Sequence, residues 1–430
     1  MVGPDVEITG ASFDGREVTP GQLFVPLVAD RDGHEFVSQA IGAGAVAYLT
    51  SRPANPDVAA SAVEVADTAD ALMDVAAWAT RRLDVPVVGI TGSVGKTSTK
   101  DLAATAIGSA LRVAANVRSF NNEQGLPVTV LGASDDVEVL VLEMGMRGFG
   151  QITRLCAAAP PTIGIVTAVA PSHTELVGGI EGVARAKAEL VAALPASGVA
   201  VLNADDERVA AMAAASPAPV LRCGEAPGSD VRIVDLVLDD WARPSFRLET
   251  PWGAVDVGLA VTGRHMAANA VLALAAACAL GVPMEVAADA LGAAGLSPSR
   301  MALHRPADGV TVIDDAYNAN PTSMRAALDT LASIPAGRRV AVVGMMAELH
   351  DPVPSHRGIA DYASVLGIEL VTVGTDLYGP PPTADPVAAV TNGDTTSLAV
   401  LVKASRVAQL DRVARALVRE LGDADYRDQS

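Results

Sequence analysis

Between residues 87 and 202 the chain alternates short β-branched apolar runs with longer segments rich in alanine and leucine. Segment 98–111 repeats apolar residues at helical spacing, which predicts a helix. Four runs are nearly all apolar, as expected of parallel strands covered on both faces: 87–90, 137–142, 163–169 and 199–202. This alternation predicts a doubly wound α/β domain.

The segments on either side have different patterns. Residues 1–85 mix short apolar runs with turn residues and predict a small α/β domain that ends in a helix over 68–83. Residues 231–262 predict an antiparallel excursion, followed by a buried helix over 267–281. A Rossmann-like βαβ domain follows, with strands predicted over 310–313, 339–343, 369–373 and 398–402. The α/β chain is therefore divided into three domains, 1–85, 86–297 and 298–430.

Composition narrows the possible classes of function. The chain has 430 residues, is 50% hydrophobic and carries a net charge of −19, which argues against nucleic acid or an anionic membrane as its main partner. Cys156, Cys223 and Cys278 are odd in number and widely spaced, which excludes a disulfide framework or a cysteine zinc site. The first residues show no secretory signal and no segment is long enough to span a membrane, so we expect a cytoplasmic protein.

Lysine is rare in this chain. Only four of the 31 basic residues are lysines, at positions 96, 100, 187 and 403. Arginine therefore supplies the ordinary basic surface. A position that keeps lysine can do so because it needs an ammonium or amine that guanidinium cannot replace.

The strongest local signal is VVGITGSVGKTS at 87–98, a predicted strand, a glycine loop and a helix start. In such a loop the backbone N–H groups surround phosphate oxygens, the lysine reaches the β- and γ-phosphates, and the threonine hydroxyl reaches Mg²⁺. A chance glycine turn is the alternative. The nucleotide-binding residues predicted here are Gly92, Ser93, Gly95, Lys96, Thr97 and Ser98.

Other polar residues follow predicted strands, where α/β proteins place their ligands. Glu143 comes directly after one strand and suits Mg²⁺, and His173 follows the next, although both types also occur as ordinary surface residues. The run DDAYNANP at 314–321 suits ribose and adenine, or forms a plain Asx-rich turn. Lys187 lies in a helical pattern, where a solvated lysine is the alternative.

Seven ordered motifs resemble those of the Mur ligases: TGSVGKTS (91–98), SFNNEQGLP (119–127), LEMGMRGFGQI (142–152), the loop at His173, ARAKAEL (184–190), GRHMAANA (263–270) and DDAYNANPTSM (314–324). The resemblance implies a three-domain, ADP-forming, ATP-dependent amide ligase of peptidoglycan precursor synthesis, working through an acyl phosphate. DDAYNANPTSM most resembles the branch that adds D-alanyl-D-alanine to UDP-N-acetylmuramoyl-tripeptide. The opening FDGREVTPGQLFVPL resembles that branch's uridine-binding domain.

The resemblance also implies roles for individual residues. Lys96 and Thr97 would hold the ATP phosphates and one Mg²⁺, with Glu143 as a metal ligand. His173 would bind a second Mg²⁺, and Lys187 would be carbamoylated. Contacts to the nucleotide would come from Asn269, Arg300, Asp315, Asn318 and Asn320. Contacts to the UDP-linked substrate would come from Asp14, Arg16, Asn121 and Asn122.

Two other classes of function stay open. A related Mur ligase or a folate-type ligase would add a different amino acid, although the NANP turn speaks against both. A divergent relative that binds nucleotide without ligating is compatible with Gly15 and Met345, where this chain departs from the family pattern. The third residue of the acceptor, lysine or diaminopimelate, does not follow from these motifs.

Overall fold

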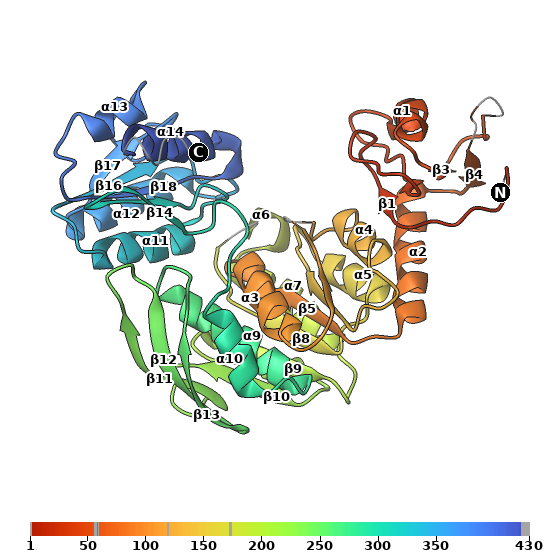
Figure 1. The fold of residues 1–430 in the computed structure, drawn as a ribbon, viewed down its shortest axis with the longest axis horizontal. Coiled ribbons are helices and arrows are strands. Elements are labelled where there is room, and N and C mark those ends of the chain that lie inside the picture. The colour runs from red at the N-terminus through yellow and green to blue at the C-terminus, as the bar shows by residue number, and fades with distance from the viewer. Residues whose placement is uncertain (1, 56–57, 59, 118–119, 172–173, 423–430) are drawn as a thin grey trace.

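The computed structural model describes residues 2–55, 58, 60–117, 120–171 and 174–422, and it contains three sheets (Figure 1). The N-terminal sheet is parallel and consists of β1 (Ala11–Ser12), β2 (Leu23–Phe24), β3 (Ala47–Thr50) and β4 (Ser61–Glu64), in that order. Its helical elements are η1 (Gly33–Phe36), α1 (Val37–Gly42) and α2 (Thr68–Leu83). The helix predicted over 68–83 is confirmed.

The central sheet has the strand order β13-β12-β11-β10-β9-β8-β5-β7-β6. Its strands are β5 (Val87–Thr91), β6 (Val113–Ala115), β7 (Val139–Glu143), β8 (Ile163–Val166), β9 (Val199–Asn203), β10 (Val220–Gly224), β11 (Val231–Leu238), β12 (Pro244–Thr250) and β13 (Gly253–Gly258). The four predicted central strands are confirmed as β5, β7, β8 and β9, with β7 starting two residues later and β8 ending three residues earlier than predicted. The antiparallel excursion is also confirmed, because β11, β12 and β13 pair antiparallel at one edge.

Helices cover both faces of the central sheet, as a doubly wound fold requires. They are α3 (Lys96–Gly108), α4 (Gly125–Leu131), α5 (Gln151–Ala158), α6 (Thr174–Val177), α7 (Ile180–Ala192), α8 (Glu207–Ala211), η2 (Met212–Ala215), α9 (His265–Ala279) and α10 (Met284–Leu291). Val88 of β5 packs in a cluster with α3, α9 and α10, whereas Val87 packs in a cluster with α2, α4, α5 and α7. Successive residues of a central strand therefore pack against helices on opposite faces of the sheet, which explains why these strands are apolar at nearly every position.

The C-terminal sheet has the order β14-β15-β18-β16-β17. Its strands are β14 (Ala302–Ala307), β15 (Val310–Asp314), β16 (Arg338–Val343), β17 (Glu369–Thr372) and β18 (Leu398–Lys403). Its helices are α11 (Pro321–Ser333), α12 (Pro352–Val365), α13 (Pro386–Thr391), η3 (Arg406–Ala408) and α14 (Asp411–Glu420). All pairs are parallel except β14 with β15. The predicted three-domain α/β class is confirmed.

Figure 1 shows the N-terminal and C-terminal sheets on opposite sides of the central domain. The N-terminal side is joined through α2, whose Leu72 packs with the N-terminal sheet while Met73 packs with the central domain. On the other side, the Ser297 amide donates to the Asp101 carboxylate of α3 at 2.7 Å. We propose domain boundaries at 85/86, just after α2, and at 297/298, next to the Ser297–Asp101 hydrogen bond. Among the described residues, every helix is too short or too polar to cross a bilayer.

Candidate active site

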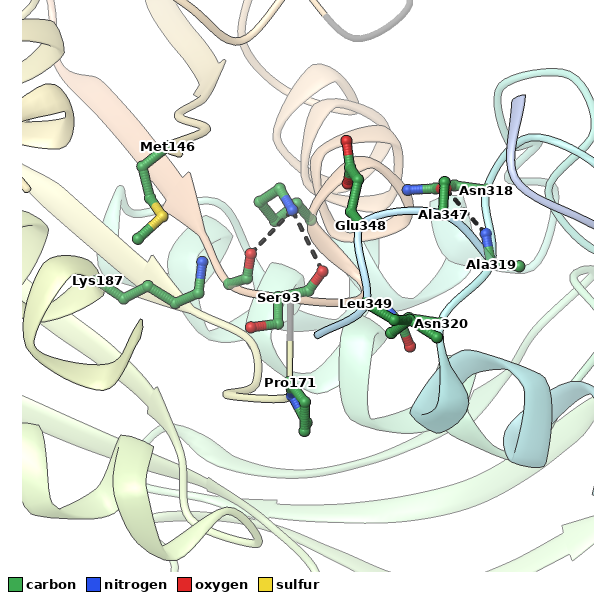
Figure 2. A pocket seen from close by; sticks show the side chains of 12 residues that line it. Ser93, Met146, Pro171, Lys187, Asn318, Ala319, Asn320, Ala347, Glu348 and Leu349 are labelled. Carbon is green, nitrogen blue, oxygen red and sulfur yellow. Dashed lines mark hydrogen bonds between the residues drawn. The ribbon is translucent and has the colours of Figure 1, made fainter. Parts of the chain in front are cut away.

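A pocket opens where loops of the central domain face loops of the C-terminal domain (Figure 2). The central domain contributes Gly92, Ser93, Lys96, Met146, Pro171 and Lys187. The C-terminal domain contributes Asn318, Ala319, Asn320, Ala347, Glu348 and Leu349. The glycine loop and the NANP turn, which are more than 200 residues apart in the sequence, therefore line one site.

The glycine loop follows β5 and leads into α3, as predicted. Gly95 is the residue before α3 and has φ +82°, and a Cβ atom there would lie 2.6 Å from Asn269 Oδ1. Gly92 lies so close to Thr167 that any side chain would collide with its hydroxyl. The Lys96 ammonium donates to the Gly92 carbonyl oxygen at 2.8 Å, within the loop itself. The loop backbone is thus shaped for close approach by a ligand.

Oxygen donors converge beside this loop. The register of β5 and β7 pairs Ile90 with Glu143, so the last residue of β7 lies next to the start of the loop. The Thr97 hydroxyl donates to Glu143 Oε2 at 2.6 Å, and Asn121 Nδ2 donates to Glu143 Oε1 at 2.6 Å. Thr97 and Glu143 are both buried.

This donor set fits Mg²⁺. A carboxylate and a hydroxyl are hard oxygen ligands, and Mg²⁺ commonly takes only one or two protein ligands beside substrate phosphates and water. No cluster of three or more His, Cys, Asp or Glu side chains forms a self-contained metal cage within the described ranges. A metal here would therefore depend on phosphate oxygens. His173 lies outside the described residues.

Lys187 reaches the same pocket from α7, with its ammonium pointing toward the glycine loop (Figure 2). The side chain is only 3% exposed, and it makes no hydrogen bond or ion pair with any described residue. Burial lowers its pKa well below the ordinary value, and the nearby charge of Lys96 lowers that pKa further. Burial also lowers the pKa of Lys96, although the Glu143 carboxylate opposes the shift. Lys187 is thus not the solvated surface lysine that the helical pattern also allowed.

The C-terminal side of the pocket is held by a buried ion pair. Lys403 ends β18, and its ammonium donates to Asp315 Oδ2 at 2.5 Å and to the Asn318 carbonyl oxygen at 2.9 Å. Asp315 Oδ1 also accepts from the Met301 amide at 3.1 Å. Asn320 caps α11 by accepting from the Ser323 amide at 2.9 Å. These bonds fix the turn that carries Asn318 into the pocket.

The remaining nucleotide-side residues also lie near the loop. Asn269 is 7% exposed and contacts the loop at Gly95. Ser98 is buried in α3, and the Ser93 hydroxyl donates to the Ala170 carbonyl oxygen at 2.9 Å. The Arg300 guanidinium lies 4.1 Å from the centre of the Tyr317 ring, within the first segment of the C-terminal domain.

The predicted substrate-side residues fall into separate groups. Asp14 and Arg16 pair with each other in the N-terminal domain at 2.6 Å, and the Arg16 hydrogen bond lowers the pKa of Asp14 to about 2. Asn121 contacts Glu143, whereas Asn122 Oδ1 accepts from the Gly125 amide at the start of α4 at 2.9 Å. The two predicted asparagines therefore occupy different positions, and only Asn121 reaches the site near β7.

Several residues that line the pocket or hold its loops were missing from the predicted site. Ser405 accepts from the Ala347 amide at 2.9 Å and donates to the Ala319 carbonyl oxygen at 3.2 Å, which ties the two C-terminal loops together. Glu348 and Met146 line the pocket directly. Two features of the sequence singled out Lys403, namely the rarity of lysine and its position directly after a predicted strand. No motif singled out Ser405.

Three family models match the chain: the Mur ligase middle domain over residues 90–277, the Mur ligase glutamate ligase domain over 299–426, and the Mur ligase family catalytic domain over 7–78. A Mycobacterium tuberculosis relative is 42% identical over 398 residues, covering 86% of this chain and 78% of the relative, and is named UDP-N-acetylmuramoyl-tripeptide–D-alanyl-D-alanine ligase. The chain belongs to the Mur ligase family. The predicted family is therefore confirmed.

Solved Mur ligases share the whole architecture. An Acinetobacter baumannii structure is titled as the ligase of UDP-N-acetylmuramoylalanyl-D-glutamyl-2,6-diaminopimelate and D-alanyl-D-alanine. It is 28% identical with a TM-score of 0.85, over 97% of this chain and 94% of that one. A Thermotoga maritima MurF ligase in complex with ADP is 25% identical with a TM-score of 0.85, over 96% of this chain and 97% of that one. As a Mur ligase, this chain is an ATP-dependent ligase.

Proposed function

We propose that this Mur ligase joins D-alanyl-D-alanine to UDP-N-acetylmuramoyl-tripeptide and so completes a peptidoglycan precursor. The observation that carries the proposal is the pocket in which the glycine loop and Lys187 face the NANP turn across a domain boundary. The M. tuberculosis relative, named for the same reaction, supports this choice of substrates.

The reaction requires activation of a carboxylate, which is a poor electrophile. The acceptor carboxylate attacks the γ-phosphorus of ATP and displaces ADP, giving an acyl phosphate. The amine of D-alanyl-D-alanine then attacks the acyl carbon, a proton leaves the nitrogen, and inorganic phosphate departs as the amide forms. A site enclosed between two domains excludes the water that would otherwise hydrolyse the acyl phosphate.

The central-domain residues would position the phosphates. The loop from Gly92 to Ser98 binds them through its amides, and the Lys96 ammonium exchanges its bond to the Gly92 carbonyl oxygen for phosphate oxygens. Thr97 and Glu143 would hold one Mg²⁺, while His173 is proposed to bind a second. Bound Mg²⁺ supplies charge neutralisation for the phosphoryl group during transfer.

Lys187 is proposed to act as a carbamate. Burial lowers the pKa of the Lys187 amine, which increases the share of its neutral form, and only the neutral amine reacts with CO₂. The nitrogen of the neutral amine attacks the carbon of CO₂ and loses a proton, which gives an anion with two oxygen atoms. Such an anion would favour metal ions beside Glu143, whereas an ammonium would repel them.

The remaining residues are proposed to bind the two ends of the substrates. Asn269, Arg300, Asp315, Asn318 and Asn320 would contact the nucleotide. Asp14, Arg16, Asn121 and Asn122 would contact the UDP-linked acceptor. For Asp14 and Arg16, this requires the ligand to bind a preformed ion pair.

A product assay tests the proposal. Purified protein is supplied with ATP, Mg²⁺, UDP-N-acetylmuramoyl-tripeptide and D-alanyl-D-alanine, and each component is omitted in turn while ADP and the amide product are measured. We expect ADP and amide in equal amounts, and neither beyond one turnover without the dipeptide. Steady-state ATP hydrolysis that does not depend on the dipeptide would instead favour a relative that does not ligate.

A further inference from the structure

One acidic side chain lines the pocket. Among the described residues around it, three can carry a charge, and they are Lys96, Lys187 and Glu348. Glu348 belongs to the loop after β16, and Figure 2 shows it on the opposite side of the pocket from Lys187. The central domain therefore presents cations to the pocket, and the C-terminal domain presents one anion.

The backbone of Glu348 has an unfavourable conformation. Its φ angle is +63°, in the left-handed region that a residue with a long side chain rarely adopts. The side chain is exposed, so burial in a core does not offset this conformation. A conformation of this kind persists only where the surrounding structure imposes it, and such positions cluster at ligand sites.

The preceding residues impose this conformation on Glu348. Residues 344–347 each make a hydrogen bond at 2.9 or 3.0 Å to another segment of the C-terminal domain, and the partners are Tyr378, Ser405 and His356. Four successive residues are thus fixed by groups outside the loop. The loop that carries the carboxylate is therefore ordered before a ligand binds, which reduces the entropy lost on binding.

His356 shows how closely the loop is fitted to its support. Its Nδ1 lies 2.6 Å from the Pro352 carbonyl oxygen, which can only accept, so Nδ1 carries the proton. Nε2 then has a free lone pair and accepts from the Met346 amide at 2.9 Å. Burial lowers the pKa of His356, which favours this neutral form.

Glu348 also lies close to the reacting centre. Burial lowers the pKa of Lys96, whereas the charges of the Glu143 and Glu348 carboxylates raise it. The lysine of such a loop reaches the β- and γ-phosphates, and the acyl phosphate forms at the γ-phosphate. An attacking nitrogen must come within about 3–3.5 Å of the acyl carbon. The amine therefore enters the part of the pocket on which the Glu348 charge acts.

We infer that the Glu348 carboxylate binds the ammonium group of D-alanyl-D-alanine and orients the nitrogen that attacks the acyl phosphate. This inference rests on the proposed function. The α-amino group of a peptide is largely protonated at neutral pH, and a carboxylate accepts charge-assisted hydrogen bonds from it. The same carboxylate would repel the phosphates of ATP. The ammonium releases one proton to water, the neutral nitrogen attacks, and its second proton leaves with the phosphate.

The test separates binding of the amine from formation of the acyl phosphate. Hydroxylamine is uncharged at neutral pH and converts an acyl phosphate into a hydroxamate, so it reports the first step without needing a site for a cation. In Glu348→Gln we expect KM for the dipeptide to rise about 10-fold and the rate of hydroxamate formation to stay unchanged. Asp361→Asn is the matched control, because Asp361 is an exposed carboxylate on α12 that does not line the pocket.

Glu348→Gly is the second variant, because it removes the carboxylate and accommodates the left-handed backbone. We expect the same rise in KM together with a Tm at least as high as that of wild type.

A KM for the dipeptide that stays at the wild-type value in both variants would overturn the inference. So would a hydroxamate rate that falls as far as the amide rate, since Glu348 would then serve the nucleotide or its metal. Failure of the proposed function gives a different result, because wild type itself would then form no amide from the dipeptide.

Discussion

The buried pair of Lys403 and Asp315 gives the sharpest test of how the C-terminal side of the pocket is held in place. Their side chains are 2% and 14% exposed, and one ammonium serves both the Asp315 carboxylate and the Asn318 carbonyl oxygen. Lys403→Met keeps the length of the side chain but removes the cation beside the largely buried Asp315 carboxylate, which keeps its hydrogen bond from the Met301 amide. Removing one member of a buried pair costs about 3–5 kcal/mol, and the partial exposure of Asp315 favours the lower end of that range.

Differential scanning calorimetry measures this cost. A loss of about 3 kcal/mol should lower the Tm of the C-terminal domain by about 10 °C. Turnover should fall by roughly 10²-fold because the Asn318 turn moves. The double variant Lys403→Met with Asp315→Asn removes the unpaired charge and should recover at least half of the lost stability. A single variant within about 1 kcal/mol of wild type, or a double variant no more stable than the single one, would refute the reasoning.

Three further predictions concern single groups. Glu143→Gln should raise the Mg²⁺ concentration for half-maximal phosphate release about 10-fold by removing the ligand charge, whereas the exposed Asp136→Asn should leave this titration unchanged. Lys187→Ala should be nearly inactive, short carboxylic acids should restore part of its rate, and ¹³C-labelled bicarbonate should give a carbamate signal only in wild type. Arg16→Gln should raise the pKa of Asp14 from about 2 toward 3.8 in a ¹³C NMR titration. The small stabilisation that this exposed ion pair supplies is present above pH 3.8 and is lost as pH falls toward 2.

The sequence predicted the central domain well because parallel strands buried on both faces give long apolar runs. The strands β5 and β9 lie within one residue of their predicted ends. The N-terminal sheet gave no comparable signal, since β1 and β2 have only two residues each and no period can be detected over that length. Their pairing depends on contacts with β3, whose residues are 24 positions further along the chain than their partners in β2.

The sequence could predict the position of a site residue when that residue directly follows a predicted strand. This rule placed Glu143 at the carboxyl end of β7, and the glycine-loop pattern singled out Thr97. In the structure the Thr97 hydroxyl oxygen and a Glu143 carboxylate oxygen are 2.6 Å apart. Contacts between loops of different strands follow no such rule. The bond from Asn121 to Glu143 and the bonds made by Ser405 depend on how loops fold back over the sheet.

The rarity of lysine in this chain indicated enclosed positions that the sequence motifs did not indicate. Lys100, Lys187 and Lys403 are each less than 5% exposed, and Lys96 lines the pocket. A guanidinium has five N–H donors in a rigid plane, all of which need partners when buried, whereas an ammonium needs only three and can rotate toward them. Lys100 meets this need with Asp101 and the Asn116 carbonyl oxygen, and Lys403 does so in the C-terminal turn. Lysine in this chain therefore occurs where a cation or an amine is enclosed, so counting four residues located parts of the site that spacing alone could not.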